Sequence, residues 1–102
     1  MSLTEDLVAA QTASGFSITD MGTWFGVNRE TMRTWLLGRR PGGHRLPQIQ
    51  IELKLLQLAL RGGVDGYDLP VPLSVTQYER RAYIEGVRNA IANRILTAHT
   101  AA

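Results

Sequence analysis

The sequence predicts a mainly α-helical protein in which four helices form a domain over residues 1–62 and a fifth, amphipathic helix follows a loop rich in glycine and proline. Three observations favour this fold class. Apolar residues recur at steps of three and four, capping residues precede these segments, and glycine or proline follows them. Apolar residues make up 44% and charged residues 20% of the 102 residues, which is typical of one folded domain with an appendage.

The first two helices are indicated by apolar spacing and by start signals. A helix covers about residues 3–14, since its apolar residues lie at helical spacing, and it ends near Gly15. Ser17 and Asp20 then form a capping box with Asp in place of Glu. This box predicts a second helix over about residues 18–25.

Two further helices follow within the first domain. Gly26 ends the second helix, and Asn28 is a good N-cap for a third helix over residues 29–37. Residues 46–60 are strongly apolar. Strict alternation over residues 49–55 is compatible with a strand, but the length and the interspersed Gln, Glu and Lys favour a fourth helix.

The C-terminal part begins with "GGVDGYDLPVP", which forbids a continuous helix and predicts a linker or ordered loop over residues 63–76. Thr76 and Glu79 then form a capping box, and an amphipathic helix follows over about residues 77–98. Its apolar stripe contains Ile84, Val87, Ile91 and Ile95. The stripe packs either on the same domain or on a second copy. Because four helices of about 60 residues already close a core, we expect self-association through residues 77–102.

The stretch between residues 21 and 35 has the spacing of two short helices that cross steeply through a tight turn. Its inward residues are expected to be Met21, Phe25, Val27, Met32 and Trp35. Gly22 falls at the helix contact and Gly26 at the turn, where such a crossing leaves least room. This is the helix-turn-helix arrangement, whose second helix can project into a DNA major groove.

Positive charge is concentrated in the middle of the chain. Residues 1–27 contain three acidic residues and no Lys or Arg, whereas residues 28–62 contain seven basic and two acidic residues, a net charge of +5. Residues 63–102 contain four residues of each sign. We therefore expect an anionic partner to meet the middle third.

The outward side of the third helix follows from its period once Met32 and Trp35 face inward. It consists of Asn28, Arg29, Glu30, Arg33, Thr34 and Leu37. Arginine suits guanine, asparagine suits adenine, glutamate suits cytosine, and threonine suits a phosphate or a thymine methyl group. Arg39 and Arg40 follow the helix directly, where backbone phosphates would lie.

The stretch "ITDMGTWFGVNRETMRTWLLGRRP" resembles the Cro/C1-type (XRE-like) helix-turn-helix family of mostly bacterial and phage transcriptional regulators. The matching residues are Gly22 in the place usually held by Ala, Gly26 and Val27 in the turn, inward Met32 and Trp35, and the "W-x-x-G-R-R-P" exit. The resemblance covers about residues 3–61. It implies DNA contacts at the outward residues above, with Thr19 and Arg39 or Arg40 near phosphates.

The family also implies a repressor-like protein that binds double-stranded DNA as a dimer in the cytoplasm of a bacterial host cell. Trp24 departs from the pattern, because that position is usually exposed and polar. We expect Trp24 to be the docking point of the C-terminal helix and to contribute to self-association. The segment after residue 62 has no counterpart in the family.

Three alternatives to a sequence-specific regulator remain open. One is a plain helical hairpin in a bundle, although the arginines after the turn favour DNA binding. Another is a DNA-packaging (small-terminase-like) assembly protein with an N-terminal helix-turn-helix. The third is a protein-interaction module such as an antitoxin.

Several function classes are excluded. The absence of cysteine excludes disulfides, thiolate zinc sites and a cysteine nucleophile. His44 and His99 have no further ligands at metal-binding spacing, so we expect no metal. No serine, histidine and carboxylate arrangement indicates a catalytic residue or an enzyme, and nothing indicates a cofactor or a small-molecule ligand. Acidic residues at the N-terminus and the lack of a long apolar run predict no signal peptide and no membrane association.

Overall fold

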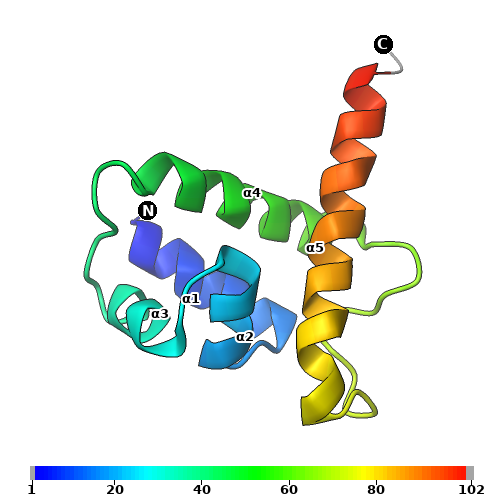
Figure 1. The fold of residues 1–102 in the computed structure, drawn as a ribbon, viewed down its shortest axis with the longest axis horizontal. Helices are drawn as coiled ribbons and strands as arrows, with labels where there is room; N and C mark the ends of the chain where they lie inside the picture. The colour runs from blue at the N-terminus through cyan, green and yellow to red at the C-terminus, as the bar shows by residue number, and fades with distance from the viewer. Residues whose placement is uncertain (1, 101–102) are drawn as a thin grey trace.

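Five helices make up the part of the chain that the computed structural model describes, residues 2–100, with side chains described to residue 97. They are α1 (Leu3–Ser14), α2 (Ile18–Phe25), α3 (Arg29–Leu36), α4 (Leu46–Gly62) and α5 (Gln77–Thr100) (Figure 1). Within residues 2–100 there is no strand, only an isolated bridge between Val64 and Tyr67. The all-helical class is confirmed, and the strand alternative for residues 49–55 is wrong. No described helix is long and apolar enough to cross a membrane.

Local sequence signals set the helix starts. Ser17 Oγ accepts a hydrogen bond from the Asp20 amide at 3.1 Å, and the Asp20 carboxylate accepts one from the Ser17 amide at 2.9 Å, which completes the predicted capping box. Asn28 Oδ1 caps α3 by accepting from the Thr31 amide at 2.8 Å. Gly26 ends α2 with φ of 73°, in the left-handed region that favours glycine. The residue types at these positions therefore account for the break between α2 and α3.

A close approach of backbone atoms joins α2 to α3. The Val27 amide donates to the Gly22 carbonyl at 3.0 Å, and a Cβ added at Gly22 would lie 2.6 Å from the carbonyl oxygen of Val27. Any side chain at this position would push the turn outward. Met21, Met32 and Trp35 are buried beneath the crossing, as the spacing predicted.

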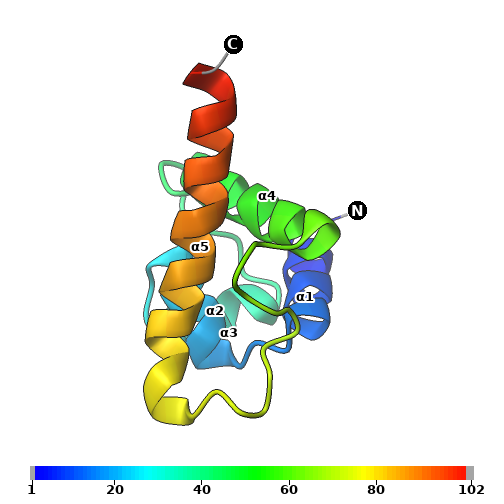
Figure 2. The same cartoon turned by 90° about the vertical axis from the view of Figure 1, so that its right-hand side faces the viewer.

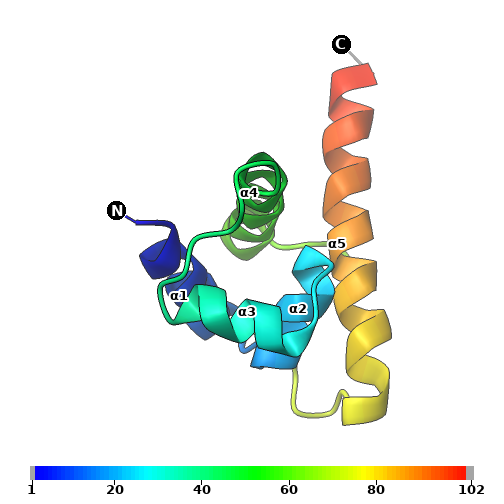
Figure 3. The same ribbon diagram turned by 60° about the vertical axis from the view of Figure 1, so that its left-hand side comes forward.

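Helix α5 lies across α2 and α4, and its C-terminal end projects beyond the other helices (Figure 1, Figure 2 and Figure 3). Ile84, Val87 and Ile91 are fully buried in one core with residues of the other helices. This corrects the expectation that the stripe pairs with a second copy, because α2 and α4 of the same chain already cover these three side chains. Ile95 is only partly buried.

Two ion pairs between buried carboxylates and arginines fix α5 to the body. Asp20 of α2 accepts hydrogen bonds from Nε and Nη2 of Arg80 at 2.8 and 2.6 Å. Glu52 of α4 accepts from Nε and Nη2 of Arg88 at 2.8 and 2.5 Å, and from Gln48 Nε2 at 3.0 Å. The Asp20 and Glu52 side chains are only 7% and 5% exposed, so each charge depends on its arginine. The hydrogen bond to Glu52 raises the pKa of Arg88.

Trp24 lies where α2, α4 and α5 meet. It is 1% exposed, and its Nε1 donates to the carbonyl oxygen of Glu52 at 2.9 Å. Its ring centroid lies 6.0 Å from that of Phe16, and it lines a surface hollow together with Glu85 and Arg88 of α5. Trp24 is therefore a core residue at the α5 contact, with no exposed face for a second copy.

The loop over residues 63–76 is ordered and connects the helices without separating them. Val64 is buried in the common core. Tyr67 packs edge-on against Tyr83 of α5 with ring centroids 5.1 Å apart. The Tyr83 hydroxyl donates to the Asp68 carbonyl at 3.1 Å and accepts from the Asp68 amide at 2.6 Å. The fifth helix thus shares the core of the first four.

Candidate nucleic-acid interface

The residues predicted to contact DNA all lie at least partly exposed to solvent, on α3 or on the segments beside it. Arg33 and Thr34 are partly exposed, and the others are exposed: Thr19, Asn28, Arg29, Glu30, Leu37, Arg39 and Arg40. Met32 and Trp35 lie on the opposite, buried side of α3. The helix therefore presents one polar side to solvent while the other closes the core.

Two of the predicted base contacts are already used in local hydrogen bonds. Asn28 Oδ1 holds the N-cap of α3 through the Thr31 amide, so in a bidentate contact with adenine, which uses both amide atoms, the base would share this oxygen with the cap. The Thr34 hydroxyl donates to the Thr31 carbonyl at 2.7 Å. The Asn28 amide nitrogen and the Thr34 methyl group take no part in these two hydrogen bonds.

Arg33 and Glu30 form a bidentate pair on the outer side of α3. Arg33 Nη2 lies 2.6 Å from Glu30 Oε1, and Nε lies 3.1 Å from Oε2. This hydrogen bonding lowers the pKa of Glu30 and raises the pKa of Arg33, so both side chains are charged at neutral pH. Glu30 thus occupies two of the five donors with which Arg33 could contact a guanine.

Arginines gather in a hollow between α3 and the loop that follows it. Its walls are formed by Glu30, Thr31, Thr34, Trp35, Arg39, Arg40, Gly42 and Arg45. The hollow brings Thr34, Arg39 and Arg40 together, as a common phosphate-binding role would require. Three arginines stand against one glutamate here, so the hollow favours an anion.

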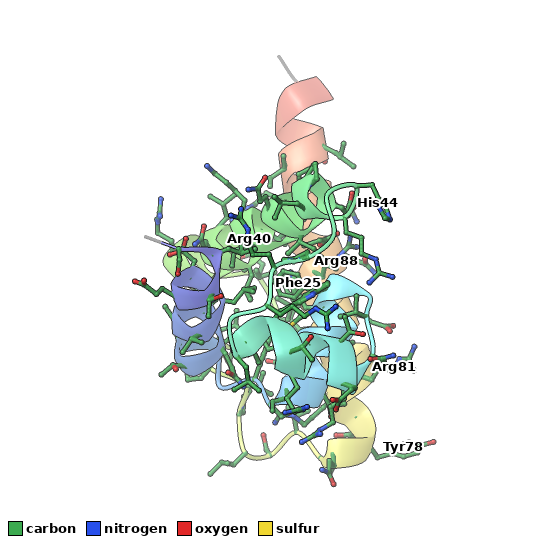
Figure 4. All side chains as sticks on the ribbon, turned by 90° about the vertical axis from the view of Figure 1, so that its left-hand side faces the viewer. Phe25, Arg40, His44, Tyr78, Arg81 and Arg88 are labelled. Atoms are coloured by element: carbon green, nitrogen blue, oxygen red, sulfur yellow. The ribbon has the colours of Figure 1, made fainter. Side chains whose placement is uncertain are left out.

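A second hollow lies at the N-terminal end of α3, and helix α5 supplies part of its wall. It is lined by Thr19, Gly22, Thr23, Gly26, Val27, Asn28, Arg29, Arg81 and Glu85. Thr19, Asn28 and Arg29 are the predicted residues that meet here. In Figure 4, which views the molecule from the side of α3, Arg40 and Arg81 lie on opposite sides of this helix. Of the predicted set, Arg33 and Leu37 line neither hollow.

Two arginines beside α3 were not among the predicted contacts. Arg45 completes the first hollow. Its position in the same loop as Arg39 and Arg40 could have predicted a contact with the same anion. Arg81 lines the second hollow from a helix more than forty positions later in the chain. No spacing in the sequence links Arg81 to α3, so only the three-dimensional arrangement reveals it.

The described residues contain no group of three or more His, Cys, Asp or Glu side chains that would hold a metal ion. His44 is exposed in the loop before α4, and the side chain of His99 lies outside the described residues. Among described residues, every buried polar side-chain atom has a hydrogen-bond partner. The buried carboxylates Asp20 and Glu52 are thus structural ion-pair partners, held by α5.

No protein-family model matches the chain, and comparisons with curated proteins and with solved structures found no significant match.

Proposed function

We propose that the chain is a helix-turn-helix protein that binds double-stranded DNA sequence-specifically and acts as a transcriptional regulator, with α3 as the reading helix. The observation that carries the proposal is the exposed polar side of α3, which follows a tight turn and has one arginine-lined hollow along its flank and another at its N-terminal end. An eight-residue helix is about 12 Å long. A B-DNA major groove about 12 Å wide admits a helix of this kind.

The roles of the residues divide by position. Arg29, Glu30 and Arg33 lie on the outer side of α3 and would contact base edges, since their side chains extend from the helix itself. Leu37 is 73% exposed at the end of α3, where an apolar side chain would meet a thymine methyl group. Arg39, Arg40 and Arg45 of the first hollow would bind backbone phosphates and supply affinity that depends on salt.

We further propose that the protein binds its site as a dimer, with two α3 helices about 34 Å apart on a near-palindromic duplex. The pairing surface would not be the stripe of Ile84, Val87 and Ile91, which is buried within one chain. Of the residues predicted for self-association, Ile95 remains partly exposed, near the projecting end of α5.

Selection of bound duplexes from a random pool, read together with the mass of the protein in solution, tests the proposal. A dimeric mass and a recovered motif with two-fold symmetry are expected. A ring of many subunits would instead support the DNA-packaging alternative. Failure to bind any duplex at low salt would refute DNA binding and support a protein-interaction module.

Substitutions on α3 separate base reading from phosphate binding. Arg33→Ala should cost about 1–3 kcal/mol on the selected duplex and much less on random DNA. Glu30→Gln removes the carboxylate that holds Arg33, so binding to random DNA should strengthen. Arg61→Ala is the matched control, since Arg61 is an exposed arginine that lines a hollow on the α1 side of α4. Equal losses on both duplexes would assign Arg33 to phosphate binding.

A further inference from the structure

Helix α5 carries four arginines in its described part, and three of them hold the helix on the body. Arg80 donates to Asp20 and to the Gly15 carbonyl, Arg88 donates to Glu52, and Arg94 donates to the Gly63 carbonyl. The fourth, Arg81, has its one hydrogen-bond and ion-pair partner among the described residues in Glu85, four residues later on the same helix, at 3.1 Å. Its side chain is 82% exposed. Arg81 is therefore the arginine of α5 that packing does not use.

Arg81 projects beside the N-terminal end of α3. It shares the second hollow with Thr19 of α2 and with Asn28 and Arg29 at the start of α3. Figure 4 shows Arg81 at the edge of the molecule, pointing away from the body. The hollow holds two arginines against Glu85, so its net charge is positive.

The position of Arg81 is fixed by the residue before it. Arg80 is bound by two hydrogen bonds to Asp20, and Asp20 directly follows Thr19. The ion pair thus joins the backbone next to Arg81 to the backbone next to Thr19, across two helices. The turn of α5 that carries Arg81 is therefore already placed beside α3 in the free protein, so this turn need not be ordered when a ligand binds.

From these observations we propose that Arg81 binds a backbone phosphate of the same duplex that α3 reads, so that α5 forms part of the DNA-binding surface. This inference rests on the proposed DNA binding. The ligand is a phosphodiester, because the hollow beside α3 offers guanidinium and hydroxyl donors, which are the groups that contact backbone phosphates. Glu85 weakens the contact by holding Arg81 in the free protein.

The test is the salt dependence of binding to the selected duplex and to random duplex DNA, for the full chain and for three variants. Arg81→Ala should weaken binding to both duplexes equally, by about tenfold at roughly 0.1 M salt, and lower the slope of log K against log salt by about one. Glu85→Gln should tighten binding to both duplexes. Arg61→Ala, the control, should change neither quantity, because it removes the same charge from the α1 side of α4.

The outcomes separate this inference from the proposed function. If the unmodified chain binds no duplex, the proposed function itself fails. If the chain binds DNA but Arg81→Ala behaves like Arg61→Ala, only the role of Arg81 is overturned. A loss confined to the selected duplex would also overturn it, since a phosphate contact carries no sequence preference. Arg81 is exposed, so its substitution should leave the fold intact.

Discussion

Replacing Arg88 by methionine should expose how strongly α5 depends on its buried ion pairs. Arg88→Met keeps a long side chain but removes both hydrogen bonds to the Glu52 carboxylate. Glu52 is 4% exposed, and only Gln48 would then donate to its side chain. A buried carboxylate left without its cation is strongly destabilising.

The expected cost can be set from the exposure of the pair. Removal of one partner of a buried ion pair costs about 3–5 kcal/mol. The Arg88 side chain is 33% exposed, so water reaches the edge of the site and a value of about 3 kcal/mol is appropriate. Because urea slopes for small proteins are about 1–3 kcal/mol/M, the midpoint of urea unfolding should fall by roughly 1–3 M.

A double variant and an exposed control make the measurement decisive. Glu52→Leu combined with Arg88→Met replaces both charges by apolar side chains and should recover most of the loss, since no buried charge is left unpaired. Arg81→Met, on the exposed side of the same helix, should change the free energy of unfolding by about 0.5 kcal/mol or less. If Arg88→Met costs no more than Arg81→Met, the ion pair does not hold α5 as described.

Substitutions at two further positions test the crossing of α2 with α3 and the contact with α5. Gly22→Ala places a Cβ 2.6 Å from the Val27 carbonyl oxygen. The overpacking should cost about 1–3 kcal/mol and outweigh the gain in helix propensity of about 1 kcal/mol, so the melting temperature should fall. A higher melting temperature would contradict the close approach. Trp24→Ala should cost about 3–5 kcal/mol in urea unfolding because the indole is 1% exposed. Trp24→Phe loses the hydrogen bond to Glu52 and part of the indole packing but keeps an aromatic ring, so it should cost about 1–3 kcal/mol. Equal losses for the two Trp24 variants would show that packing is not the larger contribution.

The features that the sequence predicted are those set by local chemistry. Ser17, Asp20 and Asn28 cap helices where expected, because capping depends on residues three positions apart. Gly22 and Gly26 also stand where the turn needs them. The outward side of α3 followed from helical periodicity alone, since a buried Trp35 fixes the rotation of the helix.

The features that the sequence did not predict depend on partners distant in the chain. Periodicity identified the stripe of α5 containing Ile84, but it carries no information on whether the same chain or a second copy covers that stripe. Arg80 and Arg88 lie off the apolar stripe, where helical periodicity alone indicates no partner. Their buried carboxylate partners are on other helices, and in the sequence such residues look like ordinary surface charges. Arg81 was missed for the same reason.

The packing and the two ion pairs of α5 also determine how far the chain can be truncated from its C-terminus without losing the fold. A fragment ending within residues 63–76 would keep α1 to α4 but strip the cations from Asp20 and Glu52 and uncover Trp24. Such a fragment would lose both ion pairs and expose the apolar faces of α2 and α4 that Ile84, Val87 and Ile91 now cover, at a cost comparable to the whole stability of a small domain. The smallest piece of this protein that folds by itself should therefore extend through Ile91, and the apparent appendage is a structural part of the domain.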